Sequence, residues 1–269
     1  MGSRQNTELL KSADAQEDRQ FIKSLARGFE VLQAFRAEDN GLSNAELSKR
    51  TGYPRSTLSR LTFTLLALNY LHLDENSGKY FLHPHILSLG YPVLSRLSIR
   101  ELARPMMQEL ADSLYSAVVL GIRDGLNMIV IERARHSTMA TWPSDIGIAR
   151  DIATSALGRA CIVALDDQQR EALISELCAK NPARAETIKT GIDSSLASYA
   201  EHGYTVSEGD WVPEYSAVGV PLKLRDGNII AFNCGGYSNR LNREQLDQMG
   251  QQLVQLVKRF SQFLGSNPV

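Results

Sequence analysis

The stretch of residues 42–81 constrains the fold of this chain more than any other. Ser43 can cap the start of a helix, with Glu46 three residues later as its capping-box partner. Gly52 can end that helix in a left-handed conformation, and Pro54 suits the first turn of a second helix. Two helices joined by such a short turn predict a helix-turn-helix.

The second helix changes character along its length. From Arg55 to Arg60 it is polar and basic with no acidic residue, whereas from Leu61 to Leu68 it is largely apolar and is expected to be buried. A DNA-recognition helix has this polarity, because its N-terminal residues face base edges and phosphates. The side chains of this segment and of the preceding cap that are expected to reach bases or phosphates are Ser43, Arg55, Ser56, Thr57, Ser59 and Arg60.

A β-hairpin is expected directly after the second helix. Residues 70–73 and 79–82 form two short alternating runs around the turn-forming residues Asn76-Ser77-Gly78. In this position the hairpin would be the wing of a winged helix-turn-helix, with Lys79 placed to contact the DNA backbone. A helical hairpin followed by an unrelated β-hairpin is the alternative, but the complete order of the parts favours DNA binding.

One further helix, over residues 24–35, is expected to complete the DNA-binding head. It carries Arg27 near its start, and this side chain could contact a phosphate or form a surface ion pair. The apolar residues that helical spacing places on one face are Leu25, Phe29, Leu32 and Phe35.

The chain as a whole is expected to divide into four segments. Apolar residues continue at helical intervals from Ile99 to Leu114, with Pro105 expected to kink or restart that helix. The segments are a mobile polar tail (1–20), a winged helix-turn-helix domain (21–83), a helical linker region (84–104) and an effector-binding and oligomerisation domain (105–269).

Charge is distributed unevenly, although the net charge is only −1. Residues 21–83 carry eight Lys and Arg against six Asp and Glu, whereas residues 99–269 carry 17 against 20. A slightly basic front and a slightly acidic back fit a DNA-binding head on a body that does not bind DNA, although differences this small also arise by chance.

The composition predicts a cytoplasmic protein without a metal, a cofactor or a membrane partner. Cys161, Cys178 and Cys234 lie far apart, with no Cys-x-x-Cys pair and no histidine at metal-binding spacing, so free thiols in a reducing compartment are expected. No apolar run reaches the length of a membrane span, and the N-terminus lacks the apolar core of a signal peptide.

The C-terminal part is expected to be an α+β domain in which helices cover an antiparallel sheet. Strands are expected at residues 117–122, 128–133, 138–142, 218–224 and 229–234. Helices are expected to start near Thr154, at a cap on Asp166, over residues 182–202 and at a cap on Asn242.

Three features of this domain could line a ligand site. Small residues after Ser155 open a helix whose free backbone N–H groups favour a carboxylate, although tight packing of the helix on the sheet explains the same residues. Residues 207–214 mix acids, a tryptophan and turn formers, which suits a pocket loop or a solvated connection. Residues 233–236 end a strand with glycines that allow a ligand or a helix to approach closely.

Over residues 21–265 the chain resembles the IclR family of bacterial transcriptional regulators. The resemblance implies an N-terminal winged helix-turn-helix, a helical linker and a C-terminal effector-binding domain similar to a GAF/PAS fold. Members are typically dimers or dimers of dimers and sense small metabolites, often organic or aromatic acids, and a dimer would recognise a palindromic operator. The runs that carry the resemblance are Ser24–Gly28, Thr51–Thr57 with Arg60-Leu61, Ala153–Ala160, Gly203-Tyr204 and Ala217–Leu222.

The resemblance also implies where an effector would bind. The helix start at residues 156–158 matches the one that holds an effector carboxylate, and the acidic position of the family falls at Glu208 or Asp210. The chain departs from the best-known member where that protein has a thiol and two hydroxyls, and Trp142 and Trp211 favour a flatter or aromatic ligand. The effector-site residues expected on this basis are Trp142, Ala156, Leu157, Gly158, Glu208, Asp210, Ala217, Asn233 and Gly235.

A ligand-responsive transcriptional regulator is therefore the main hypothesis. The first alternative is an enzyme acting on a small acid, with Cys161 or Cys234 as nucleophile, but local spacing assembles no nucleophile, base and orienting group. The second alternative is a DNA-binding regulator without a small-molecule ligand.

Overall fold

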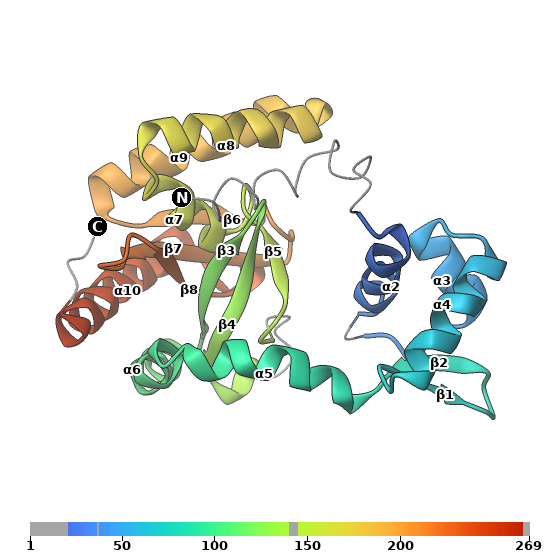
Figure 1. The fold of residues 1–269 in the computed structure, drawn as a ribbon. Coiled ribbons are helices and arrows are strands. Elements are labelled where there is room, and N and C mark those ends of the chain that lie inside the picture. The colour runs from blue at the N-terminus through green and yellow to red at the C-terminus, as the bar shows by residue number, and fades with distance from the viewer. Residues whose placement is uncertain (1–20, 37, 140–144, 266–269) are drawn as a thin grey trace. The chain divides into compact units, whose positions relative to one another are not determined.

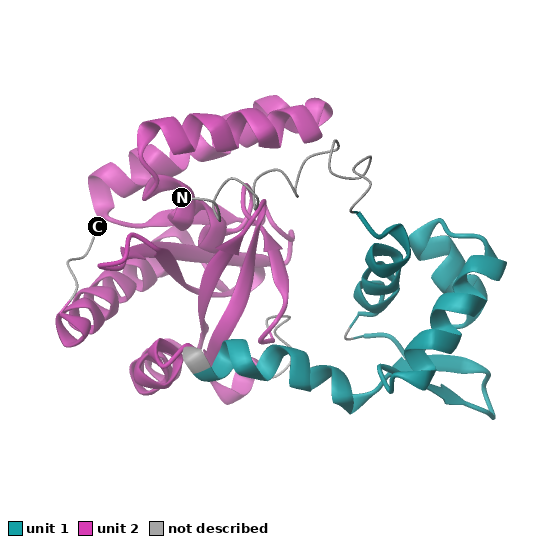
Figure 2. Ribbon diagram, in the orientation of Figure 1, with its two compact units in different colours: residues 1–96 teal, residues 97–269 magenta. Residues whose placement is uncertain are grey.

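The computed structural model describes residues 21–36, 38–139 and 145–265, and the chain forms two compact units, residues 1–96 and 97–269 (Figure 2). The first unit is a winged helix-turn-helix followed by a further helix. Its elements are α2 (Lys23–Gln33), α3 (Asn44–Thr51), α4 (Arg55–Ala67), β1 (Leu71–Asp74), β2 (Lys79–Leu82), the short η2 (Pro84–Ile86) and α5 (Leu87–Arg96).

The helix-turn-helix and its wing confirm the prediction. The backbone N–H of Ser43 donates to Glu46 Oε2 over 2.8 Å, and the N–H of Glu46 donates to Ser43 Oγ over 3.3 Å, which completes the capping box. Gly52 ends α3 with φ of +75°. Pro54 is the N-cap of α4, one residue before the position expected for it. Strands β1 and β2 pair antiparallel from Leu71 opposite Leu82 to Asp74 opposite Lys79.

The apolar side chains of α2 and α4 are less buried than expected. Leu25 and Phe29 of α2 are 58% and 50% exposed, and Phe63 of α4 is 73% exposed. Only one face of each helix meets the small core, which in α4 is the face of Leu58 and Leu65. Helical spacing identifies an apolar stripe but does not show whether the same chain covers it.

We expect Ser43→Ala to weaken the start of α3, because it removes one half of the capping box. The loss should be about 1 kcal/mol of local stability, which corresponds to roughly fivefold faster amide exchange in α3. Hydrogen exchange on the full chain measures this effect. Thr64→Ala, on the exposed side of α4, is the control, and equal exchange of α3 in both variants would contradict the role of the cap.

The second unit is built on a six-stranded antiparallel sheet in the order β5-β4-β3-β8-β7-β6. Its α+β architecture confirms the prediction (Figure 1). The strands are β3 (Ala117–Asp124), β4 (Asn127–Arg135), β5 (Ala149–Asp151), β6 (Thr205–Glu208), β7 (Tyr215–Lys223) and β8 (Ile229–Tyr237). The helices are α6 (Ile99–Ser113), α7 (Ala156–Val163), α8 (Asp167–Lys180), α9 (Ala185–His202) and α10 (Arg243–Leu264), with short 3-10 turns η3 (Ser137–Met139), η4 (Pro182–Arg184) and η5 (Ser238–Arg240).

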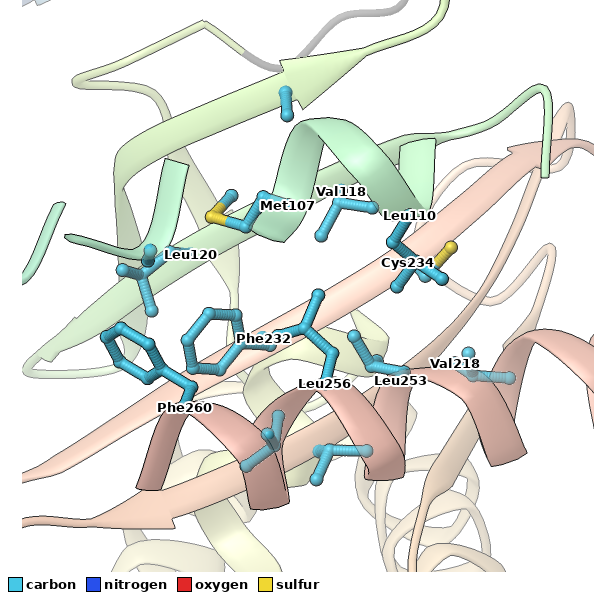
Figure 3. Packing of buried hydrophobic residues seen from close by; sticks show 14 of the residues in the cluster. Met107, Leu110, Val118, Leu120, Val218, Phe232, Cys234, Leu253, Leu256 and Phe260 are labelled. Carbon is cyan, nitrogen blue, oxygen red and sulfur yellow. The ribbon is translucent and has the colours of Figure 1, made fainter. Parts of the chain in front are cut away.

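Helices cover both faces of this sheet, and each face has its own core. Helices α6 and α10 cover one face, where Phe232 of β8 lies opposite Phe260 of α10 (Figure 3). The centroids of these two rings are 5.5 Å apart. Helices α7, α8 and α9 cover the other face, where Val119 and Ala231 point. We call this second side the α7 face. Because side chains alternate along a strand, the register assigns each residue to one of the two faces.

Three details of the second unit differ from the prediction. The strand expected over residues 138–142 is not formed at its start, since Thr138 and Met139 lie in η3, and residues 140–144 are outside the described ranges. Helix α6 runs unbroken through Pro105, so the helix does not restart there. The short strands β5 and β6 were not expected, because three or four residues are too few to show a period.

Candidate DNA-binding and effector sites

The residues expected to contact DNA gather at the start of α4. Arg55 and Ser56 are exposed in its first turn. Arg27 from α2 lies over the ring of Tyr53, with its guanidinium carbon 5.2 Å from the ring centroid. A hollow of about 570 Å³ is lined by Arg27, Thr57, Ser59 and Arg60, together with neighbours on α2 and α4.

Two of the predicted contact residues are already bonded within the fold. The Ser43 hydroxyl donates to Glu46 Oε2 over 2.7 Å. The Ser59 hydroxyl accepts from Asn44 Nδ2 over 3.0 Å and donates to the carbonyl of Arg55 over 2.9 Å. The Ser43 bond belongs to the cap of α3, whereas the bond between Asn44 and Ser59 joins α3 to α4.

The basic side chains of the winged helix-turn-helix differ in whether they already form ion pairs or hydrogen bonds within the fold. Arg50 forms a two-pronged ion pair with Asp39, over 2.6 and 2.7 Å, which holds the pKa of that carboxyl below its usual value. Lys79 donates to the carbonyl of Asn40 over 3.4 Å. Within the described ranges no ion pair involves Arg55 or Arg60, so both guanidinium groups are available to phosphates or base edges.

The helix start expected to hold a carboxylate is tightly packed. Ser155 caps α7, and its hydroxyl accepts from the N–H of Gly158 over 3.1 Å. A Cβ on Gly158 would lie 2.2 Å from the carbonyl oxygen of Ile152, so this backbone approach requires glycine. Packing therefore explains Gly158, and the neighbouring Ala156 and Leu157 are also buried.

The two candidate acids lie on opposite sides of the sheet. Asp210 accepts from Arg159 of α7 over 2.7 Å, so it belongs to the α7 face. Glu208 accepts from Arg243 of α10 over 2.9 Å. Ser207 is the residue paired with Ala217, and its neighbour Glu208 points the other way. Of the two acids, Asp210 is the one on the same face of the sheet as the remaining candidates.

Three other predicted positions come together on the α7 face. Ala217 pairs with Gly235, and Asn233 pairs with Gly219 two residues along the same strands. Asn233 is 1% exposed, and its side-chain Oδ1 has no hydrogen-bond partner within the described part of the chain. A buried acceptor in this state is available to a ligand donor. Trp142 lies outside the described residues.

Arg150 of β5 is the residue that sequence reasoning missed. It is 1% exposed and pairs in register with Met128, which places it on the α7 face. Its guanidinium carbon lies 4.6 Å from the ring centroid of Trp211. Trp211 in turn approaches Tyr215, and Tyr215 approaches Tyr237, with centroids 6.3 and 5.3 Å apart. The alternation of Ile148, Arg150 and Ile152 is the one sequence signal that could have indicated a buried arginine.

The cysteines are free thiols, and two of them are deeply buried. Burial raises the pKa of Cys161 to about 11 and that of Cys234 to about 12, so neither supplies a thiolate at neutral pH. Among the described residues, no three His, Cys, Asp or Glu side chains are grouped as a metal site would need. No helix in the described ranges is long and apolar enough to span a bilayer.

Known proteins resemble both units. The family model for the IclR helix-turn-helix domain matches residues 24–75, and the model for the bacterial transcriptional regulator IclR C-terminal domain matches residues 91–262. The HTH-type transcriptional regulator TsaQ1/TsaQ2 of Comamonas testosteroni is 31% identical over 241 residues, which cover 88% of this chain and 86% of that protein.

Solved structures show the same fold. An IclR family transcriptional regulator from Brucella abortus has a TM-score of 0.78 and 39% identity, covering 94% of this chain and 97% of its own. An IclR homologue from Microbacterium hydrocarbonoxydans, crystallised with 4-hydroxybenzoate, has a TM-score of 0.64 and 17% identity, covering 88% and 99%. The chain therefore belongs to the IclR family of bacterial transcriptional regulators, DNA-binding proteins whose C-terminal domain is of a ligand-binding type.

Proposed function

We propose that this regulator binds a palindromic operator as a homodimer, or as a dimer of dimers, and that a small organic acid in its C-terminal domain changes that binding. The observation that carries the acid-sensing part is the set of buried polar groups on the α7 face that have no hydrogen-bond partner among the described residues, of which Asn233 Oδ1 is one. Coupling of this kind is reciprocal, so operator DNA changes the affinity for the acid by the same factor.

The DNA contacts divide by role. Ser56, Thr57 and Arg60 would reach base edges or phosphates from the first two turns of α4. Arg55, Arg27 and Lys79 would contact mainly phosphates, which set affinity and register without reading sequence. In a dimer, two copies of α4 would enter the major groove about one helical turn, roughly 34 Å, apart.

Exposed apolar side chains in the first unit support self-association. Leu87, Tyr91 and Val93 of α5 are 72%, 70% and 57% exposed, and Leu25 and Phe29 of α2 are exposed by half or more. Monomeric proteins rarely leave several large apolar groups of one segment in water. A second copy of the chain is the partner that a palindromic operator would require.

The proposal is tested by titrating the full-length protein against its own upstream DNA, with and without a panel of organic and aromatic acids. We expect tight, sequence-selective binding that weakens with salt and that at least one acid shifts. Selective binding that no acid shifts would contradict the sensor. The absence of selective binding to this DNA and to neighbouring promoters would contradict the regulator.

Arg60→Ala should weaken operator binding by about 10- to 100-fold, because it removes a cation from the DNA-facing side of α4. If Arg60 contacts a phosphate, the slope of log K against log salt should also fall by about 1. Fluorescence anisotropy over a salt series measures both effects, with Arg259→Ala on α10 as the control. Acid binding should be unchanged, and an equal loss of acid and DNA binding would contradict the division of labour between the two units.

A further inference from the structure

Among the buried charged side chains described, Arg150 is the one without an ion-pair partner. Its Nε and Nη2 atoms are fully buried and have no hydrogen-bond partner within the described ranges. These two nitrogens carry the parallel N–H groups of one edge of the guanidinium. That edge matches the two oxygens of a carboxylate, which it binds with two parallel hydrogen bonds.

We propose that this edge of Arg150 binds the carboxylate of the effector, and that the protein selects monocarboxylate anions with an apolar body. The inference rests on the proposed acid-sensing function and names the residue that makes the site selective for an acid. It assigns the contact with the carboxylate to Arg150, whereas at the helix start of α7 the N–H of Gly158 already donates to Ser155.

The nearby acids are committed to other partners. Asp145 pairs with Arg133, and Asp210 pairs with Arg159. Asp151, the neighbour of Arg150, accepts from the N–H groups of Ala153 and Thr154 and from the Thr154 hydroxyl. Residues 140–144, the undescribed stretch nearest to Arg150 in sequence, contain no acid.

A buried cation without a counter-charge is unfavourable, and an arriving anion relieves that cost. Burial lowers the pKa of Arg150 to about 9, so the group still carries its charge at neutral pH. The charge is therefore present when a ligand arrives. Since Arg133 and Arg159 already have carboxylate partners, the single open guanidinium edge of Arg150 favours one carboxylate per ligand over two.

The surroundings hold the guanidinium in place and define the rest of the ligand. The ring of Trp211 lies against the guanidinium of Arg150 in a cation–π contact. Tyr215 and Tyr237 pack with the small, buried Ala117 and with Met139 on the same face. Apolar and aromatic groups of this kind suit an apolar ligand body, and Asn233 Oδ1 offers an acceptor for a hydroxyl on that body.

The test compares carboxylates with their uncharged amides on the full-length protein. The probes are benzoate, 4-hydroxybenzoate and phenylacetate, with benzamide, 4-hydroxybenzamide and phenylacetamide as matched neutral forms. We expect at least one acid to raise the melting temperature and shift operator binding, and its amide to do neither. Arg150→Met should raise the half-saturating acid concentration at least tenfold, and Arg150→Lys should raise it less.

A second readout does not depend on the choice of acid. Ligand-free Arg150→Met should melt at or above the temperature of the unsubstituted protein, because it removes an uncompensated buried charge, and it should bind the operator unchanged. Arg123→Met, an exposed arginine of β3, is the matched control and should keep the acid response. If Arg150→Met melts several degrees below the unsubstituted protein, Arg150 stabilises the fold and the inference is overturned.

The outcomes separate this inference from the proposed function. An acid response that Arg150→Met leaves unchanged overturns the role of Arg150 and keeps the sensor. An equal response to an acid and to its amide also overturns it. A protein that binds its operator but responds to none of the acids contradicts both the sensor and the role of Arg150.

Discussion

Gly158→Ala should destabilise the C-terminal unit by about 3 kcal/mol, the upper end of the usual cost of overpacking. The added Cβ would lie 2.2 Å from the carbonyl oxygen and 2.4 Å from the Cα of Ile152, and backbone atoms cannot rotate away as a flexible side chain does. Helix α7 would have to move off the turn that precedes it. The melting temperature should fall by about 6–12 °C on the scale for domains of this size.

Thermal unfolding of the full-length protein measures this effect, and Gly28→Ala is the matched control. Gly28 lies within α2, where a new Cβ meets nothing within 4 Å, so alanine there should be neutral or stabilising by up to about 1 kcal/mol. A Gly158→Ala protein that melts normally but loses its acid response would contradict the packing explanation and favour a ligand at this backbone.

The same close packing recurs where α7 crosses the sheet. A Cβ on Gly219 of β7 would lie 2.1 Å from the carbonyl oxygen of Ala156, and the Thr205 hydroxyl donates to that same oxygen over 3.1 Å. Two glycines and one hydroxyl thus fix α7 on the sheet. Arg159 of that helix is thereby held where it can bind Asp210.

The elements that sequence analysis predicted well are those with local causes. Ser43 with Glu46, and Asn242 with Gln245, form capping boxes between residues three apart, and Gly52 and Gly203 end their helices at positive φ. Such interactions need no knowledge of the rest of the fold. The winged helix-turn-helix and the longer helices and strands of the C-terminal unit followed from these signals, whereas the short β5 and β6 did not.

The candidate effector site was harder to predict because it depends on strand pairing. Glu208 and Asp210 are two residues apart, so in one continuous strand both side chains would point to the same face. Glu208 instead bonds to α10 and Asp210 to α7, because β6 ends at Glu208. Arg150 lies in a three-residue strand whose burial follows from its pairing with β4. A single arginine between apolar residues does not reveal that its strand pairs with β4.

The exposed side chains of α2 and α5 were equally hard to predict, because a stripe covered by the same chain and a stripe covered by another chain have the same spacing. Leu25 and Phe29 lie on α2, just after its N-cap Ile22, and Leu87 and Tyr91 are one turn apart on α5. Within one chain these groups remain in water. If a second copy covers them, this apolar pattern marks an interface between two chains and not a core.

Tyr91→Asp should therefore abolish the dimer and reduce operator affinity by about 100- to 10,000-fold. The side chain is 70% exposed in a single chain, so the folding of that chain should change by no more than about 0.5 kcal/mol. At an interface, however, the new carboxylate would be buried without a partner. A monomer would bind one half-site at a time and lose the gain in effective concentration that links the two heads.

Light scattering on a sizing column measures the assembly state, and anisotropy on a full operator and on a half-site measures the affinities. The variant should bind both DNAs equally weakly, whereas the unsubstituted protein should prefer the full operator. Phe263→Asp is the matched control, because it also places a charge at an exposed aromatic position, 69% exposed, but near the end of α10. This control should still prefer the full operator to the half-site. If Tyr91→Asp remains dimeric and keeps its operator affinity, the apolar side of α5 is not the surface that joins the two heads. The exposed apolar residues of α2 then become the next candidates, because Leu25 and Phe29 lie one turn apart and are half exposed or more.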